Sequence, residues 1–560
     1  MQHDIDLRIT RASYVYIDFD YDKRILKYVK ENIPGRKYVK RSKEWKFKLD
    51  KHSIRAFFDF LREFDISNPP DEIQDRMKEI IQDVKQREKQ KKRNLELVEK
   101  DDLPDFQVKG TRRGMELYPF QKVGVKYAVE NKNVIIGDQP GLGKTASAIN
   151  AIHHQDAYPC LVVCPATLKD HWKREWNQWL PRKTCKVQSS KNLDFNCRVS
   201  VINYSILWKY RKEIKDWGFN SLILDESHYV KNKDSQRSKA ARQIAKSING
   251  PKILLSGTAV VNRPKELINQ LKIIDRFKQE FGGFWQFTKR FCNGHDSRYG
   301  YYDYDGASNL EELHQRLTSC CYIRRNKRDV LDDLPDKQFS HVVFELDNRK
   351  KYRLAENDIA AYMQTFEDCT SEGYANKLAK LAKLRKLSGV GKVKQAKSWI
   401  SNFLESGEKL VLFAHHKDVI SEIMEQFPDA LCITGDTPNG DRQNIVDQFQ
   451  EDPDEKLIVL NMQAGGTGLT LTASSTVAFL ELPWTPGEIE QCSDRVHRIS
   501  QKDAVNIYFL VAENTIDTDM LELLEQKRVV TEAVNAGNRI SDDSGNIVDR
   551  LIKNIKRKHE

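Results

Sequence analysis

Two groups of residues far apart in this chain carry the chemistry of phosphate binding and phosphoryl transfer. The first comprises Asp138-Gln-Pro-Gly-Leu-Gly-Lys-Thr145 and the acidic pair Asp225-Glu226, and the second is Gln491-Cys-Ser-Asp-Arg-Val-His-Arg498. A glycine-rich loop with a lysine can hold phosphates, adjacent carboxylates can bind Mg²⁺ and activate water, and two arginines can neutralise developing charge. We therefore predict one nucleotide-hydrolysing site assembled from two halves of the chain.

The first half has the local context of a phosphate-binding loop. The apolar run Val134–Ile136 precedes it, and an alanine-rich helical stretch follows Thr145. Gly141 and Gly143 let backbone N–H groups approach phosphate oxygens, Lys144 can reach the β- and γ-phosphates, and Thr145 can ligate Mg²⁺. Asp138 stands where the strict GxxxxGK[ST] pattern has its first glycine. The alternative is an ordinary glycine-rich turn before a helix.

Two further strand ends belong to the same predicted site. Asp225 and Glu226 follow the apolar run Leu222–Leu224, 81 residues after Lys144. We expect Asp225 to hold Mg²⁺ and Glu226 to orient or deprotonate the attacking water. Ser256 and Thr258 end another apolar strand and can report the state of the acidic loop, although the same residues also suit a tight turn.

The second half is expected to supply two cations. Arg495 and Arg498 are three residues apart, a spacing that predicts one face of a helix. Facing a triphosphate, they would neutralise charge; a surface helix with ion pairs is the alternative. Upstream, Gly466 and Gly468 lie in a second glycine-rich junction after the apolar run Leu457–Leu460.

These residues must be positioned by buried parallel strands, and the sequence contains two series of them. Short apolar runs of this kind, separated by helical stretches, are typical of α/β folds with parallel sheets. The first series is 134–136, 161–164, 222–224 and 253–255; the second is 410–413, 457–460, 477–480 and 507–510. We predict two α/β lobes, at 113–335 and 336–537, followed by a loosely attached basic tail at 538–560.

The segment before the lobes has a different composition. Residues 1–66 predict a small α+β module, with strands at 14–19 and 45–49 and a helix at 23–32. Residues 36–51 hold eight Lys/Arg against two acids, interleaved with aromatics that could stack on bases or turn into the core. Residues 67–112 are predicted to be a linker, since 17 of the 30 residues at 71–100 are charged.

Composition limits the class of protein. The 560 residues carry a net charge of +11, which suits a polyanionic partner. No apolar stretch is long enough to span a membrane and the N-terminus lacks a secretory segment, so we expect a soluble intracellular protein. The ten cysteines form no CxxC pair and His415-His416 has no partner spacing, so no metal cluster or disulfide framework is indicated. The basic row of residues 372–397 suits a solvated helix face, with a phosphate contact as the alternative.

The ordered set of motifs resembles that of the superfamily II helicase-type ATPases, and within them the Swi/Snf-like DNA translocases. The resemblance covers residues 113–535 and includes the Tyr118-Pro-Phe-Gln121 element, in which Gln121 would contact adenine. In this family the position of Asp138 is normally acidic. A finer resemblance, to the HARP-type annealing helicases, lies in Asp225-Glu-Ser-His228, in Leu412-Phe-Ala-His-His-Lys417 and in Ile323-Arg-Arg-Asn-Lys-Arg-Asp-Val-Leu331. Pro34-Gly-Arg-Lys-Tyr38 and Trp45-Lys-Phe47 resemble the HARP module itself.

The resemblance implies two RecA-like lobes that use ATP and Mg²⁺ and act on double-stranded or branched DNA. The implied residues sort by role. The catalytic residues would be Lys144, Asp225, Glu226, Arg495 and Arg498, and the nucleotide would be bound by Gln121, Asp138, Gly141, Gly143, Lys144, Thr145 and Gln491. Mg²⁺ would be bound by Thr145 and Asp225. Nucleotide binding would be coupled to DNA through Ser256, Thr258, Gly466 and Gly468, and DNA would be contacted by Arg36, Lys37, Trp45, Arg324 and Arg325.

The leading hypothesis is therefore a DNA translocase for fork remodelling, branch migration or strand annealing during replication, recombination or repair. One alternative is the same motor used to displace proteins from DNA, and a second is a DNA-binding scaffold without hydrolysis. We expect a monomer, nucleoid-associated in a bacterial or viral setting and nuclear in a eukaryotic one. The sequence identifies no protein partner.

Overall fold

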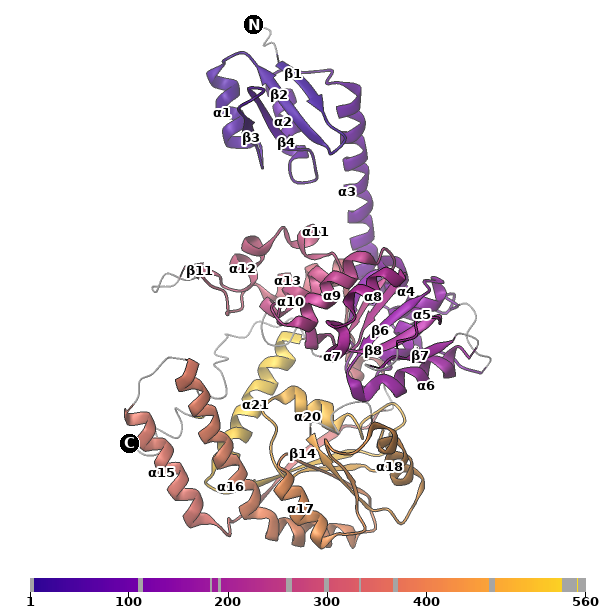
Figure 1. Ribbon diagram of the computed structural model, residues 1–560, viewed down its shortest axis with the longest axis vertical. Coiled ribbons are helices and arrows are strands. Elements are labelled where there is room, and N and C mark those ends of the chain that lie inside the picture. Colours follow the sequence, from indigo (N-terminus) through magenta and orange to yellow (C-terminus); the bar gives the residue numbers. More distant parts are fainter. Residues whose placement is uncertain are drawn as a thin grey trace. The chain divides into compact units, whose positions relative to one another are not determined.

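The computed structural model describes residues 5–108, 114–181, 184–189, 193–257, 264–296, 302–331, 334–365, 371–462, 469–535 and 551. The chain divides into two compact units, Met1–Leu97 and Val98–Glu560, and the second contains two parallel sheets (Figure 1). The predicted fold class of two α/β lobes with parallel sheets is confirmed, and a small unit with an antiparallel sheet and helices precedes them in the chain. Thr258, Gly466 and Gly468 lie outside the described residues.

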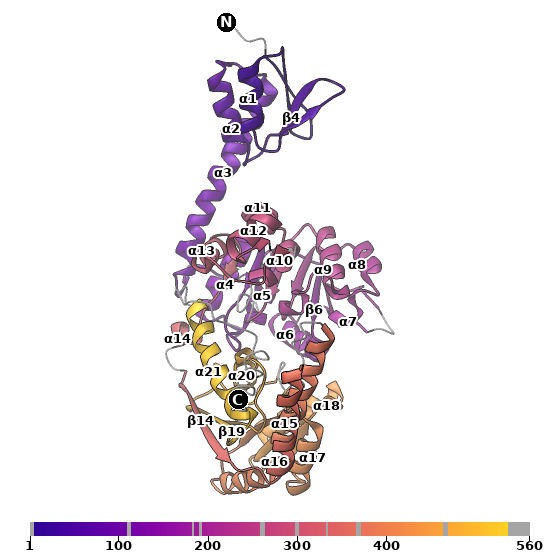
Figure 2. The same cartoon turned by 90° about the vertical axis from the view of Figure 1, so that its left-hand side faces the viewer.

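The N-terminal unit is an antiparallel sheet in the order β1-β2-β4-β3, with helices against one face (Figure 2). Its core forms because alternate strand residues such as Val15, Ile17 and Phe47 meet the apolar faces of α1 and α2. Its elements are β1 (Ile5–Ile9), β2 (Tyr14–Phe19), α1 (Lys23–Asn32), β3 (Lys37–Val39), β4 (Glu44–Lys48), α2 (Ile54–Glu63) and α3 (Asp71–Val98).

The predicted linker helix is only partly a linker. Ile73, Met77 and Ile80 of α3 are buried in the core of the N-terminal unit. They recur every three or four residues, so one stripe of an otherwise charged helix faces that core. The start of α3 is therefore part of the N-terminal unit.

The first lobe is a seven-stranded parallel sheet in the order β13-β5-β10-β9-β6-β8-β7. Each predicted apolar run is a strand of this sheet. Its strands are β5 (Asn133–Ile136), β6 (Cys160–Cys164), β7 (Cys185–Val187), β8 (Val199–Asn203), β9 (Ser221–Leu224), β10 (Lys252–Leu255) and β13 (Tyr322–Ile323). Its helices are α4 (Pro119–Asn131), α5 (Lys144–His154), α6 (Lys169–Trp179), α7 (Tyr204–Leu207), α8 (Arg211–Trp217), α9 (Gln236–Ser247), α10 (Pro264–Ile273), α11 (Phe277–Phe281), α12 (Phe284–Phe291) and α13 (Leu310–Cys320). Short 3₁₀ turns (Ala166–Leu168, Ser227–Val230) and a hairpin of β11 (His295–Asp296) and β12 (Tyr302–Asp303) complete it.

The second lobe is a six-stranded parallel sheet in the order β14-β19-β18-β15-β17-β16. Its strands are β14 (Lys337–Phe344), β15 (Leu410–Ala414), β16 (Leu431–Ile433), β17 (Leu457–Asn461), β18 (Thr476–Phe479) and β19 (Val505–Ala512). Its helices are α15 (Arg349–Thr365), α16 (Ser371–Leu404), α17 (Lys417–Gln426), α18 (Asn439–Glu451), α20 (Pro486–Ser493) and α21 (Ile516–Asn535), and α14 (Lys327–Val330) precedes β14.

Both faces of this second sheet are covered. Val411 and Phe413 of β15 belong to one apolar cluster, whereas Leu410 and Leu412 belong to another on the opposite face. Strands buried on both sides need continuous apolar runs, which is why the sequence pattern revealed them.

The basic helix and the tail differ in how well they were predicted. In α16, Leu381 and Leu384 are fully buried, while Lys380 pairs with Asp358 and Lys386 with Asp418. The expected amphipathic helix is therefore present. The prediction of a loosely attached tail is wrong at Leu551, which is fully buried in the core of the second lobe.

No helix among the described residues combines the length and apolarity needed to cross a bilayer.

Candidate active site

The phosphate-binding loop connects β5 to the first turn of α5, and its shape depends on two glycines. Gly141 and Gly143 have φ of 89° and 73°, in the left-handed region that only glycine enters at little cost. A Cβ at Gly141 would lie 3.2 Å from Lys327 Cε and 3.5 Å from Arg498 Cγ. The second group of residues therefore approaches the loop at this glycine.

Lys144 begins α5 and its ammonium group folds over the loop. Nζ donates hydrogen bonds to the carbonyl oxygens of Asp138 at 2.7 Å and Gln139 at 3.3 Å. Burial lowers the pKa of Lys144, although the carboxylates of Glu226, Asp138 and Asp225 oppose this shift. The lysine is thus held at the mouth of the loop and within electrostatic reach of the acidic pair.

The acidic pair follows β9 and is fixed by aromatic donors. The Trp172 indole N–H donates to Asp225 Oδ2 at 2.8 Å, and the Tyr204 hydroxyl donates to the Asp225 carbonyl at 2.6 Å. Burial, together with the adjacent Glu226, raises the pKa of Asp225 to about 6. Excess negative charge at hard oxygen ligands suits Mg²⁺, with the half-buried Thr145 hydroxyl as a second ligand from the protein.

Glu226 is held in an unusual backbone conformation. Its φ of 47° is uncommon for a residue with a side chain and is typical of functional sites. His228 Nδ1 lies 3.2 Å from Glu226 Oε2. Burial raises the pKa of Glu226, but His228, Lys144 and Arg495 outweigh it and keep the pKa below its ordinary value. Glu226 therefore remains an ionised carboxylate near neutral pH, as a proton acceptor must.

The two arginines come from a turn and not from a helix face. α20 ends at Ser493, and Arg495 and Arg498 lie in the turn after it. The helical placement predicted from their spacing is therefore wrong. Arg498 Nε donates to the Asp494 carbonyl at 3.1 Å, and its Nη1 donates to Thr470 Oγ1 at 2.6 Å.

Electrostatics brings the two halves together. Arg495 acts on the pKa of Glu226, and Arg498 lies against Gly141. Burial, and then the neighbouring Arg495, lower the pKa of Arg498 to about 9, so both guanidinium groups stay charged at neutral pH. Two buried cations lie beside a phosphate-binding loop, and a bound polyphosphate can neutralise their charge.

The segment that follows β13 holds the phosphate-binding loop in place through two arginines. Arg324 donates to the carbonyl oxygens of Gly137 and Gly257, at 3.0 and 2.7 Å. Arg325 Nη2 binds Asp138 Oδ2 at 2.6 Å and its Nε binds Oδ1 at 3.1 Å, and both side chains are buried. Arg325 is therefore committed to the loop, and we correct its predicted DNA contact. Asp138 likewise supports the loop by binding Arg325.

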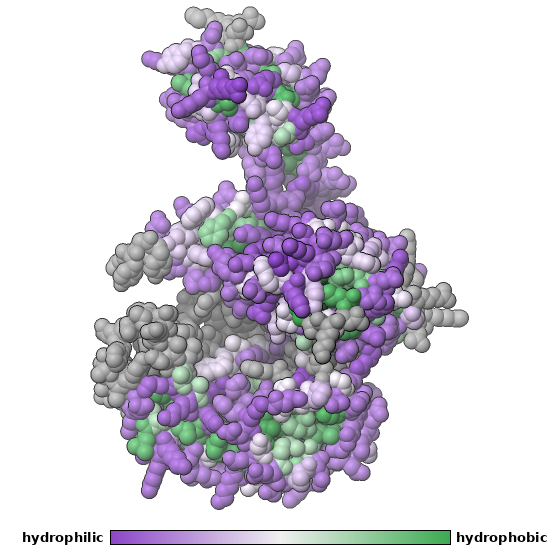
Figure 3. Space-filling view, viewed as in Figure 1, coloured by the Kyte–Doolittle hydropathy of each residue, from purple (hydrophilic) through white to green (hydrophobic). Residues whose placement is uncertain are grey.

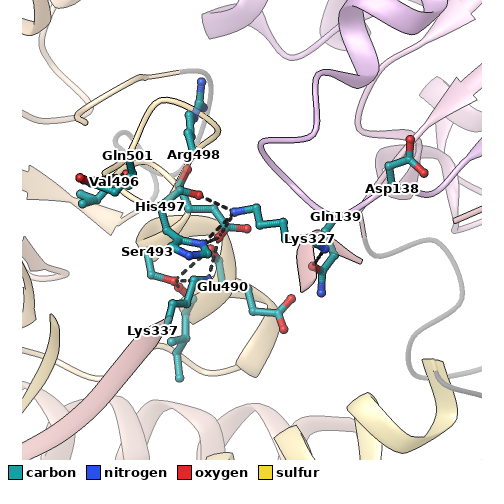
Figure 4. A network of polar contacts seen from close by, with 12 residues as sticks. Asp138, Gln139, Lys327, Lys337, Glu490, Ser493, Val496, His497, Arg498 and Gln501 are labelled. Carbon is teal, nitrogen blue, oxygen red and sulfur yellow. Dashed lines mark hydrogen bonds and ion pairs between the residues drawn. The ribbon is translucent and has the colours of Figure 1, made fainter. Parts of the chain in front are cut away.

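Lys327 continues this brace toward the arginine turn, as Figure 4 shows. Its backbone N–H donates to Gln139 Oε1 at 2.7 Å, and its Nζ donates to Asp494 Oδ1 at 2.7 Å. In the sequence this lysine belongs to a basic cluster with Arg324, Arg325 and Arg328 near the lobe boundary, which could brace the interface or meet DNA, and its contacts are those of a brace.

The remaining predicted site residues are placed less directly. Gln121 is buried and donates to the Leu142 carbonyl at 3.1 Å, so it contacts the loop. Gln491 is half-buried on α20, and Ser256 is buried at the end of β10. Trp172 and Tyr204 were missed, because a core tryptophan or tyrosine has no local feature that distinguishes it from one that holds a catalytic carboxylate.

The predicted DNA residues of the N-terminal unit separate onto different faces. Arg36 and Lys37 are exposed. Trp45 is partly buried against the helices of the unit and lies beside Tyr38, so its ring faces the core side of the sheet. Trp45 therefore has a packing role on the core side of the sheet, and its contact with DNA stays a prediction.

The Asp138–Arg325 pair yields a stability prediction. Arg325→Met should leave a buried carboxylate without its cation and destabilise the fold by about 3–5 kcal/mol. Asp138→Asn combined with Arg325→Met should recover part of this loss. Thermal and urea unfolding measure both effects.

A matched control is Arg290→Met, which removes an exposed arginine paired with Glu312 in the same lobe. We expect a loss below about 1 kcal/mol there. Equal losses for Arg290→Met and Arg325→Met would contradict the bracing role of Arg325.

Two family models and several known proteins match this chain in sequence. The SNF2-related domain matches residues 40–389, and the helicase conserved C-terminal domain matches residues 392–500. The human "DNA annealing helicase and endonuclease ZRANB3" is 33% identical over 461 residues, which are 79% of this chain and 42% of that protein. The Xenopus tropicalis "SWI/SNF-related matrix-associated actin-dependent regulator of chromatin subfamily A-like protein 1" is 31% identical over 475 residues, 82% of this chain and 49% of that protein.

The chain thus spans less than half the length of these two relatives. The solved "Sulfolobus solfataricus SWI2/SNF2 ATPase core in complex with dsDNA" is 22% identical with a TM-score of 0.38, covering 77% of this chain and 96% of that one. Since the SNF2-related match alone includes more than half of the residues, the chain belongs to the SNF2-related family and carries a helicase C-terminal domain.

Proposed function

We propose that this protein is an ATP-driven motor that translocates on double-stranded or branched DNA. The observation that carries the proposal is the approach of Arg495 and Arg498 to Glu226 and Gly141, which joins residues of two lobes in one site. A site shared by two lobes can convert nucleotide turnover into relative motion of the lobes. The names of the relatives, annealing helicases among them, support DNA as the track.

In this proposal each residue has one task. The loop N–H groups and Lys144 would bind the phosphates, and Thr145 and Asp225 would hold Mg²⁺, which would shield the charge of the phosphates. Glu226 takes the proton from the attacking water. Arg495 and Arg498 neutralise the charge that develops on the transferred phosphoryl group.

A cavity in the first lobe, lined by aromatic as well as polar side chains, offers a contact for the DNA backbone. It has a volume of 630 Å³, and Thr167, Asn203, Ser205 and Arg237 are among its lining residues. It lies where β6 and β8 end and α9 begins, with Ser235 as the N-cap of α9. Hydroxyl, amide and guanidinium groups at a helix N-terminus are typical phosphate ligands that read no sequence.

The open face of the N-terminal sheet offers a second contact. Tyr14 and Tyr16 of β2 pair in register with Lys48 and Lys46 of β4. Lys37 of β3 pairs with the same Lys46 from the other side. The Lys46 ammonium lies 5.6 Å from the Tyr14 ring centroid and 5.9 Å from that of Tyr16. The tyrosine rings can stack on bases, and the lysines between them can bind phosphates. Such a surface suits an unpaired DNA strand, which a fork exposes. The visible surface of this unit is mostly hydrophilic (Figure 3).

The first test is ATP hydrolysis measured with duplex, single-stranded, forked and four-way DNA. We expect stimulation by duplex and stronger stimulation by branched DNA. Absence of stimulation by any DNA would contradict the motor, and equal stimulation by forked and linear duplex would contradict fork preference.

The role of Glu226 as a base is tested by Glu226→Gln. This variant should bind ATP normally but lose turnover by about 10²–10⁴-fold, because the amide cannot accept the proton. Glu213→Gln, which changes an exposed carboxylate on α8, serves as control and should match the unaltered protein. Turnover that survives in Glu226→Gln would refute the assignment.

The open face is tested by the double variant Tyr14→Ala, Tyr16→Ala. We expect strand annealing and fork remodelling to slow by about tenfold or more, since stacking contributes about 1–3 kcal/mol per base, while basal ATP hydrolysis is unchanged. Tyr21→Ala is the matched control, because Tyr21 is 77% exposed but lies outside the strands. A fork-remodelling rate equal to that of Tyr21→Ala would exclude the open face as a contact.

A further inference from the structure

The connection between β13 of the first lobe and β14 of the second carries Arg324, Arg325, Lys327 and Lys337, whose contacts pass from the first half of the nucleotide site to the second. Arg324 and Arg325 hold the loop at Gly137 and Asp138. Lys327 then contacts both halves at once. Lys337 is already the first residue of β14 in the second lobe. The connection between lobes is therefore also a physical link between loop and arginine turn.

Lys327 is tied to the phosphate loop through its backbone and its side-chain stem. Its N–H donates to Gln139 Oε1 at 2.7 Å. Its Cε and Nζ lie 3.2 Å from the position of a Cβ at Gly141, against the glycine that Arg498 also approaches. A shift of the loop at Gln139 or Gly141 must therefore displace Lys327.

The ammonium group of Lys327 is committed to the arginine turn. Nζ donates to Asp494 Oδ1 at 2.7 Å and to the His497 carbonyl, and it lies 3.2 Å from His497 Nδ1. The side chains of Lys327 and Asp494 are 6% and 4% exposed. A buried, multiply bonded charge pair has a specific geometry that solvent cannot relax.

The residues that Lys327 binds are those that orient the arginines. Asp494 precedes Arg495 in the chain, and its carbonyl accepts from Arg498 Nε at 3.1 Å. His497 Nε2 makes a further contact with the Pro335 carbonyl at 2.7 Å. Displacement of Asp494 and His497 must therefore move both guanidinium groups.

Neutralising Asp494 does not by itself require Lys327. Lys337 Nζ donates to the same Asp494 Oδ1 at 2.7 Å and to Ser493 Oγ at 3.2 Å. Lys337 begins β14 of the second lobe, the lobe that also contains the turn of Asp494 after α20, and among the described residues no hydrogen bond or ion pair joins Lys337 to the phosphate loop. The two lysines share one carboxylate, but Lys327 alone of the two also binds the loop.

We propose that Lys327 is a positioning residue that sets Arg495 and Arg498 relative to the phosphate loop and transmits changes of the loop to the arginine turn. The inference rests on the proposed ATP hydrolysis at this site. It adds a residue that acts through the loop and the arginine turn and controls whether the two halves of the site are aligned.

The test compares Lys327→Met with Lys337→Met in the full chain. Each variant removes one ammonium group from Asp494, but only the first breaks the link to the loop. For Lys327→Met we expect kcat to fall by about 10²-fold, as for a catalytic group misplaced by 1 Å. Affinity for a non-hydrolysable ATP analogue should change by less than about threefold, because the loop itself is intact.

The controls separate positioning from charge and from folding. Lys337→Met should lower kcat by less than about threefold, and Lys327→Arg, which keeps the charge, should retain more activity than Lys327→Met. Equal losses in Lys327→Met and Lys337→Met would overturn the proposal. So would a parallel loss of nucleotide affinity in Lys327→Met.

A readout without nucleotide distinguishes failure of this inference from failure of the proposed function. In hydrogen exchange, Lys327→Met should speed exchange at 139–144 and at 494–498 together, whereas Lys337→Met should affect only 494–498. If the unaltered protein hydrolyses no ATP, the proposed function fails, and exchange still decides whether Lys327 links the segments. Unchanged exchange at 139–144 in Lys327→Met would refute the link.

Discussion

Two buried carboxylates, Asp138 and Asp494, must each be neutralised by a cation, and one short segment of the chain supplies cations to both. Arg325 binds the first and Lys327 the second, with Lys337 as an additional partner of Asp494. Removing one member of a buried pair leaves an uncompensated charge, which is costly. The positions of the phosphate loop and of the arginine turn therefore both depend on residues 325–337.

This dependence explains how the proposed hydrolytic site can be divided between lobes without losing alignment. The first lobe provides the phosphate-binding loop, the acidic pair and the aromatic donors that bind it. The second lobe provides the two arginines, which follow its helix α20. Each lobe has its own apolar core, so neither core fixes the distance across the site. A few polar contacts fix that distance. Because they are few, they can rearrange when the charge in the site changes.

The sequence predicted those parts of the site that depend on local spacing. Gly141, Lys144 and Asp225 could be assigned because each follows a buried strand whose apolar run is visible in the chain. The pairs Asp138–Arg325 and Lys327–Asp494 could not, because their members are 187 and 167 residues apart and no local pattern records the contact. Trp45 illustrates another limit: alternation showed that its ring and Lys46 lie on opposite faces, but not which face the helices cover. Arg495 and Arg498 have a helical spacing, yet α20 ends before them.

We propose that the arginine turn completes the nucleotide site of the other lobe. Single-turnover ATP hydrolysis by Arg498→Ala, at saturating ATP and DNA, is the decisive measurement. We expect the hydrolysis step to slow by about 10³-fold or more while ATP remains bound, since such arginines act on the charge of the transition state. A hydrolysis rate unchanged from that of the unaltered protein would contradict a site shared between the lobes.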